Sequence, residues 1–151
     1  DTGEVKVIVP ELDKDSQLTN GHTLMIGLSL LLRQPGWAEK FIAENTIRTE
    51  TDQNIPVVKV PAGGDGYLIA RLWAWYPILE LEKGQTYKIH LSSMDYNHGF
   101  SLQPVNINIQ VIPGYEHVVK MTPTKEGTYA IVCNEYCGIG HHSILGRIYV
   151  K

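Results

Sequence analysis

Two cysteines and a histidine lie at equal steps near the end of the chain. Cys133, Cys137 and His141 are each four residues apart, and the sequence contains no other cysteine. A second histidine, His98, lies upstream in Asp95-Tyr-Asn-His98-Gly-Phe100, in a loop that we expect between two strand-like runs. Thiolate and imidazole ligands together favour copper, zinc or an iron–sulfur cluster. The sequence therefore predicts a metal centre formed by these four side chains.

The segment from Cys133 to His141 is better suited to a loop than to a helix. Gly138 and Gly140 lie within it, and a glycine costs about 1 kcal/mol relative to alanine in a helix interior. A mononuclear blue copper site needs one cysteine with two histidines. The second cysteine is informative, because two thiolates can bridge two copper ions that are each capped by one histidine.

Most of the chain has the pattern of short β-strands. Apolar side chains alternate with amides between Val105 and Val111, and the run stops at Pro113-Gly114, where the chain must turn. Strands at such regular spacing indicate an all-β domain built as an antiparallel sandwich or barrel. The other predicted strands are 5–9, 57–60, 67–76, 87–91, 118–121, 129–132 and 147–150.

A helical region precedes the strand-rich part. Leucines recur from Leu24 to Leu32 at helical spacing, Asn20 is a candidate N-cap, and Pro35-Gly36 stops the run. Trp37 and Phe41 are one turn apart and predict a second short helix that runs toward Glu44. We therefore expect residues 1–66 to form an N-terminal strand and helical extension, packed on or leading into a core domain at 67–151.

The composition fits one ordinary domain. With 151 residues, 43% of them hydrophobic, the chain can bury one core, and a net charge of −3 argues against a nucleic-acid binder. The longest apolar run, Leu24 to Leu32, is shorter than the roughly 20 residues needed to cross a bilayer. Because the chain begins at Asp1 without methionine, we expect a removed signal or membrane anchor, or a truncated chain.

Three segments resemble the CuA domain of subunit II of cytochrome c oxidase, in the haem–copper oxidase family. They are 93–100, 106–114 and 127–141, and the last contains the specific motif Cys-x-Glu-x-Cys-Gly-x-x-His. The resemblance extends over about 67–151 and is greatest to bacterial subunits with one short N-terminal anchor. It implies a cupredoxin-like Greek-key β-sandwich.

The resemblance also implies a ligand set for two copper ions. His98 and His141 each cap one ion, Cys133 and Cys137 bridge both, and Glu135 contributes its backbone carbonyl. Trp73 and Trp75 look like the aromatic strand near which such domains accept electrons.

By the same resemblance, the domain belongs to the respiratory chain and transfers electrons. It would take them from a cytochrome c or a small copper protein and pass them to the haem of a catalytic haem–copper subunit. The domain alone would perform no bond chemistry, and the complex would be a terminal oxidase or a nitric oxide reductase. The expected location is the periplasm or the outer face of the cytoplasmic membrane, as a soluble fragment or an anchored domain.

One position departs from the family pattern. The family has an axial methionine three residues after the second histidine, and this chain has Ile144 there. One copper could remain three-coordinate, with a raised potential; Met94 or His142 could substitute; or the site could hold one copper or none.

Other interpretations use the same residues differently. The two cysteines could form a small disulfide, or a structural zinc ion could bind two cysteines and two histidines. A copper carrier or assembly factor on the same fold would hold Cu(I). We expect His22, His90 and His117 at surface or strand positions, and Asp95 holding the His98 loop by side-chain to backbone hydrogen bonds.

Overall fold

The computed structural model describes residues 6–8, 40–50 and 54–151. β-strands dominate these residues, as the sequence predicts. There are twelve of them, against the eight expected, and one short 3-10 helix precedes the last strand. The elements are β1 (Lys6–Ile8), β2 (Thr46–Glu50), β3 (Ile55–Lys59), β4 (Asp65–Arg71), β5 (Ala74–Tyr76), β6 (Ile78–Leu81), β7 (Tyr87–Ser93), β8 (His98–Gln103), β9 (Ile107–Val111), β10 (His117–Met121), β11 (Gly127–Val132), η2 (His141–Ser143) and β12 (Leu145–Val150).

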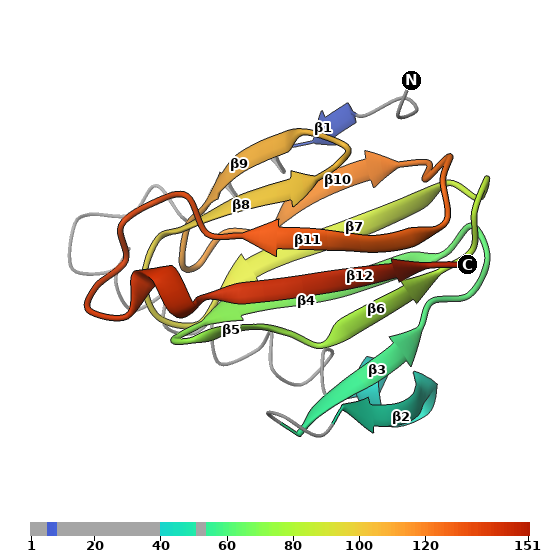
Figure 1. Cartoon of the computed structure of the whole chain (residues 1–151), viewed down its shortest axis with the longest axis horizontal. Helices are drawn as coiled ribbons and strands as arrows, with labels where there is room; N and C mark the ends of the chain where they lie inside the picture. Colours follow the sequence, from blue (N-terminus) through green and yellow to red (C-terminus); the bar gives the residue numbers. More distant parts are fainter. Residues whose placement is uncertain (1–5, 9–39, 51–53) are drawn as a thin grey trace, which may run out of the picture.

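The strands form two layers of one folded-over sheet. Hydrogen bonding runs in the order β1-β10-β7-β4-β5-β12-β11-β8-β9, and β6 joins β12 to β3. Figure 1 shows β11 and β12 in front of β7 and β4. The expectation of an antiparallel sheet is wrong for four pairs, since β4 with β7, β3 with β6, and β12 with both β5 and β6 are parallel. Parallel neighbours require crossover connections, which alternation along one strand does not reveal.

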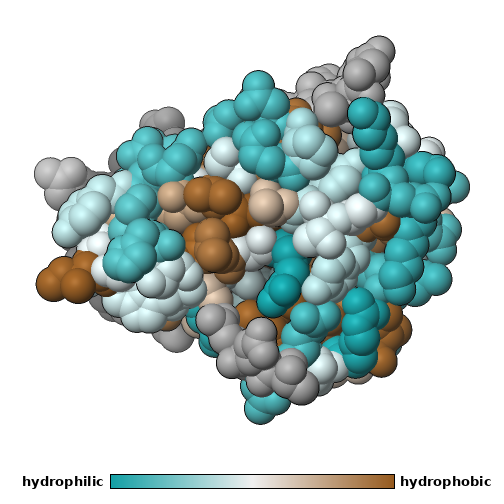
Figure 2. Space-filling view, viewed as in Figure 1, coloured by the Kyte–Doolittle hydropathy of each residue, from teal (hydrophilic) through white to brown (hydrophobic). Residues whose placement is uncertain are grey.

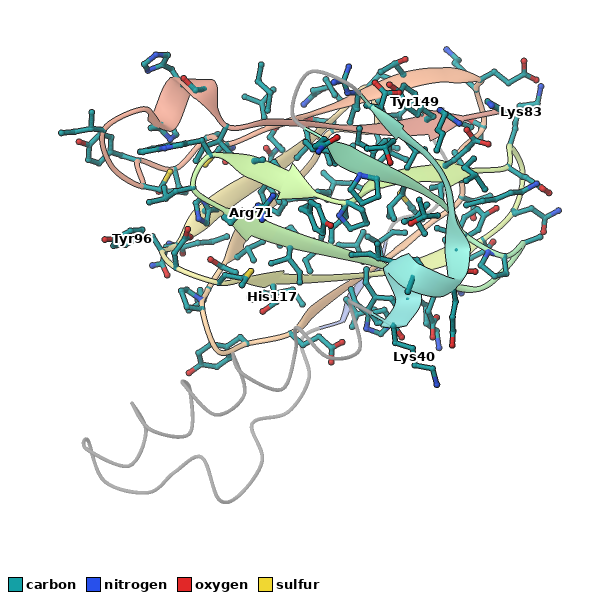
Figure 3. All side chains as sticks on the ribbon, turned by 90° about the horizontal axis from the view of Figure 1, so that it is seen from below. Lys40, Arg71, Lys83, Tyr96, His117 and Tyr149 are labelled. Carbon is teal, nitrogen blue, oxygen red and sulfur yellow. The ribbon has the colours of Figure 1, made fainter. Side chains whose placement is uncertain are left out.

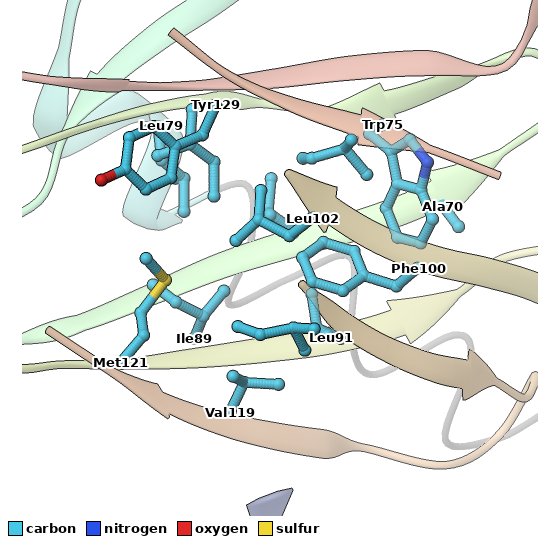
Figure 4. Close-up of a cluster of buried hydrophobic side chains, with 14 of the residues drawn as sticks. Ala70, Trp75, Leu79, Ile89, Leu91, Phe100, Leu102, Val119, Met121 and Tyr129 are labelled. Carbon is cyan, nitrogen blue, oxygen red and sulfur yellow. The ribbon is translucent and has the colours of Figure 1, made fainter. Parts of the chain in front are cut away.

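The core lies between the two layers. On β7, Tyr87, Ile89 and Leu91 are at most 1% exposed, while Lys88 between them is exposed. This alternation follows from the two-residue period of a strand. Figure 4 shows Leu91 facing Phe100 of β8, so the layers meet through apolar side chains.

The predicted strand at 67–76 is interrupted. β4 ends at Arg71, and the chain turns at Leu72 and Trp73 before β5 begins. Consequently Trp73 and Trp75 do not share one continuous strand: Trp73 is 40% exposed in the turn, and Trp75 is 1% exposed in the core. The loop predicted around His98 ends earlier than expected, because His98 is already the first residue of β8.

The N-terminal predictions are only partly within the described residues. β1 confirms the first strand, and residues 40–45 are helical, where the second short helix was expected to end. The predicted helix from Leu24 to Leu32 lies outside the described residues, as do Asn20 and His22. Val57 and Val58 of β3 are fully buried in the core, and the division at residue 66 stays a prediction. No helix within the described ranges is long and apolar enough to cross a membrane.

Candidate metal centre

Two connections meet at one end of the sandwich and carry the predicted ligands. One leads from β7 through residues 94–97 into β8, and the other leads from β11 through residues 133–140 into η2. In Figure 3, Tyr96 of the first connection lies at this end, and Lys83 lies at the opposite end. His98, at the start of β8, is therefore brought to the loop that contains both cysteines.

The four predicted side chains form a continuous row. The Cys133 and Cys137 sulfurs are 3.8 Å apart, His98 Nδ1 lies 3.9 Å from Cys133 Sγ, and His141 Nδ1 lies 3.5 Å from Cys137 Sγ. Ligand atoms of His98, Cys133 and Cys137 all lie within 4.8 Å of one another, and all three residues are buried. The order along the row is imidazole, thiol, thiol, imidazole.

The backbone of the Cys133 loop also faces this row. The Glu135 carbonyl oxygen is 3.3 Å from Cys133 Sγ, so it lies beside the pair of sulfurs. Further along, Gly140 has φ of +90°, and a Cβ there would lie 2.9 Å from the Trp73 ring. A side chain at this position would clash with Trp73, and glycine lets the loop close over the ring.

Asp95 orients His98 from the side opposite the sulfurs. Its Oδ1 is 2.6 Å from His98 Nε2, and its Oδ2 accepts the Leu72 N–H at 2.6 Å. Burial raises the pKa of Asp95, but these hydrogen bonds and one from the Tyr96 N–H outweigh it and hold the pKa below its ordinary value. An ionised Asp95 makes His98 Nε2 the donor, which leaves the Nδ1 lone pair facing Cys133. Metal-binding histidines commonly have such a carboxylate partner.

The second sulfur is held in its protonated form when no metal is bound. Burial, with a smaller contribution from the neighbouring Cys133, raises the pKa of the Cys137 thiol to about 11. Cys137 also lines an open surface pocket of about 510 Å³ with Asp95, Tyr96 and Tyr136, so the pocket lies beside this candidate ligand. Both sulfurs are free thiols, without a disulfide.

Residues 77–150 match the family described as cytochrome c oxidase subunit II, periplasmic domain. This part of the chain is similar to that family. The subunit 2 protein of Thermus thermophilus is 37% identical over 86 residues, which are 56% of this chain and 64% of the relative. A probable subunit 2 of Streptomyces coelicolor is 39% identical over 74 residues, 49% of this chain and 23% of the relative. The chain thus spans less than two thirds of the length of these curated relatives.

Solved structures confirm the fold of the subunit II domain. A chain of a haem–copper terminal oxidase dimer aligns with a TM-score of 0.56 at 23% identity, covering 87% of this chain and 100% of its own. The periplasmic domain of subunit II from Bradyrhizobium japonicum gives 0.55 at 19%, covering 60% and 86%. A rusticyanin variant gives 0.53 at 17%, covering 77% and 94%. The fold is therefore the expected cupredoxin-like sandwich, and the family description makes the domain periplasmic.

The subunit II family and the donor set agree on the kind of metal. The residues with ligand atoms close together supply two thiols and an imidazole, and soft donors of this kind suit copper. Both the family and the geometry support a copper site.

Ile144, at the position expected for the family's methionine, differs in exposure from the two residues considered as substitute ligands. Ile144 is 1% exposed and belongs to the hydrophobic core, whereas Met94 is 47% exposed and His142 is exposed on η2. The remaining described histidines lie on strands as expected: His90 on β7 and His117, which is buried, on β10.

Two contacts to the ligands were not predicted from the sequence. The Gly99 N–H donates to Cys133 Sγ at 3.4 Å, and Asp95 accepts from the His98 ring in addition to the backbone groups that were expected. The three-residue spacing of Asp95 and His98 is the one signal that could have suggested the second contact. The first depends on the path of two separate loops, which no local pattern reveals.

Proposed function

We propose that this domain holds two copper ions and transfers single electrons. Cys133 and Cys137 would bridge the ions, His98 and His141 would each cap one through Nδ1, and the Glu135 carbonyl would be a further ligand. The observation that carries the proposal is the row His98–Cys133–Cys137–His141, whose neighbouring donor atoms are 3.5 to 3.9 Å apart. A single-copper site would need only one of the two thiols.

The residues around the four proposed ligands would hold a metal centre whose ligands move little when it is oxidised or reduced. Asp95 fixes the His98 ring, and the buried sulfurs lie in a loop that contacts Gly99 of β8 and the Ile144 carbonyl just before β12. A copper pair held there would supply one-electron oxidation and reduction. Fixed ligands keep the structural change between the two states small, which favours transfer.

Similarity to the subunit II family supports two partners, one that accepts electrons from this domain and one that donates electrons to it. A catalytic haem–copper subunit would accept the electron, in a terminal oxidase or a nitric oxide reductase. A cytochrome c or a small copper protein would supply it. Tyr136 and Tyr96, which line the pocket beside Cys137, are 78% and 58% exposed and offer an aromatic surface close to the ligands.

We further propose that Ile144 occupies the position of the family's axial methionine. Its side chain contains no donor atom, and it is buried, with 1% of it exposed. The copper near His98 would then lack an axial thioether, and its potential would be higher than with methionine, since axial ligands tune potential in related sites.

A copper count with an electron paramagnetic resonance spectrum tests the proposal. We expect two copper ions per chain and hyperfine structure from one electron shared by two nuclei. One copper per chain with a single-nucleus pattern would overturn the dinuclear centre. Copper that is lost on dialysis against a chelator, without a stable mixed-valence spectrum, would favour a carrier or assembly protein.

A matched pair of histidine variants sharpens this test. His141→Gln removes a proposed ligand, whereas His142→Gln changes the adjacent exposed residue. We expect loss of the shared-electron spectrum only in the first. Loss in both, or in neither, would contradict the assignment of His141.

A further inference from the structure

Two asparagines connect the loop of residues 133–140, which contains both cysteines, to β9 at the edge of the sheet. Asn134, the residue after Cys133, donates from Nδ2 to Oδ1 of Asn108 on β9 at 3.1 Å. The sheet register explains the contact, because Asn108 pairs with Ser101 of β8, and Ser101 pairs with Val132 of β11. Asn134 lies two residues beyond Val132, after β11 has ended. Its side-chain amide therefore passes β8 and reaches β9, the next strand in the order of the sheet.

Asn134 also packs closely against Gly99, the residue that follows the proposed ligand His98. A Cβ on Gly99 would lie 1.9 Å from Asn134 Oδ1 and 2.8 Å from Asn134 N, so only glycine allows this approach. The same close approach brings the Gly99 N–H to 3.4 Å from Cys133 Sγ. Asn134 therefore packs directly against the residue whose N–H contacts the sulfur.

We propose that Asn108 and Asn134 form an amide clamp that positions the Gly99 N–H against Cys133 Sγ and thereby sets the potential of the copper centre. Both asparagines are positioning residues, and neither is a proposed ligand. The part of the inference that concerns potential rests on the proposed copper function. Hydrogen bonding around a cysteine sulfur raises the potential of a copper–thiolate site by withdrawing electron density from the sulfur.

The clamp itself can be tested without copper. In the reduced, copper-free protein, we expect Asn108→Leu to speed hydrogen exchange at the Gly99 amide by about two- to tenfold, the range that the net contribution of one hydrogen bond gives. Asn134→Ala should do the same, and the double variant should exchange no faster than either single one, because both remove one contact. Gln110→Leu, at an exposed amide of the same strand, is the control and should leave the rate unchanged. Equal rates in all variants would overturn the clamp.

The copper-loaded protein then tests its consequence. We expect Asn108→Leu and Asn134→Ala to lower the potential and shift the sulfur-to-copper absorption, without a further shift in the double variant. Additive shifts, or the same shift in Gln110→Leu, would overturn the link to potential. If the protein bound no copper, the proposed function would fail, and the exchange measurement would still decide on the clamp.

Discussion

The Cys133 N–H donates to the carbonyl oxygen of Ile144 at 3.4 Å, and the Ile144 side chain is 1% exposed. The proposed ligand that directly follows β11 is therefore joined to the residue that departs from the family pattern. Because Ile144 also donates its N–H to His141 O at 3.2 Å, its backbone lies between two proposed ligands. A change of side chain at this position therefore tests whether it faces the proposed copper site.

Ile144→Met is expected to lower the potential while the two-copper spectrum remains. Methionine would restore an axial thioether, and a swap of similar volume costs less than about 1.5 kcal/mol of folding stability. Voltammetry and paramagnetic resonance on the loaded protein check this result. Ile148→Met, fully buried four residues further on, is the control and should leave the potential unchanged. An unchanged potential in Ile144→Met would mean that position 144 does not face the metal.

Asp95→Ala is expected to reduce copper affinity by about 10- to 100-fold, as loss of a carboxylate partner of a ligating histidine commonly does. The variant removes the acceptor of His98 Nε2 and of the Leu72 N–H together. Asp95→Asn keeps an acceptor oxygen and should lose less. Competition titration with a copper chelator measures both. Equal affinity of Asp95→Ala and the unchanged protein would show that His98 needs no orienting partner.

The candidate ligands could be proposed from the sequence because three of them are local. Cys133, Cys137 and His141 lie within nine residues, so their spacing alone indicates a common centre. His98 lies 35 residues from Cys133, so its residue type and its place in a loop between two expected strands suggested it, and the family resemblance strengthened the assignment. The ring orientation that Asp95 gives to His98 is a three-dimensional property, and the sequence suggested only a structural role for Asp95.

The features that the sequence did not reveal depend on pairing between distant strands. The Asn108–Asn134 contact joins residues 26 apart through the register of three strands. The turn at Leu72 and Trp73 contains neither glycine nor proline, so an apolar run there favours one long strand. In the structure, the Leu72 N–H donates a hydrogen bond to the Asp95 side chain, and the chain turns there.

Copper affinity is expected to rise with pH across the neutral range. With the pKa of Cys137 raised to about 11, this thiol is protonated near pH 7 and must lose its proton to bind a metal. Calorimetric titration in buffers of different ionisation enthalpy would measure the protons released. Cys137→Ser should release fewer protons per copper bound. Binding without proton release in the unchanged protein would contradict the pKa direction.

The contact between His90 and Glu116 predicts how stability depends on pH. His90 Nδ1 lies 2.6 Å from Glu116 Oε1, and the His90 ring stacks on Tyr67 with ring centres 4.7 Å apart. The hydrogen bond to His90 lowers the pKa of Glu116, partly opposed by burial. A depressed carboxyl pKa stabilises the fold above the ordinary value of about 4.3, and this contribution disappears as the pH falls through the folded-state pKa.

His90→Phe keeps an aromatic ring against Tyr67 but removes the partner of Glu116. We expect this variant to be less stable than the unchanged protein at pH 6, and the two unfolding free energies to converge between about pH 5 and pH 3. Urea denaturation at a series of pH values measures the difference. Glu116→Gln should follow the same curve as His90→Phe, since both remove the same ionised hydrogen bond. A stability difference that stays constant as the pH falls would show that Glu116 ionisation does not contribute through His90.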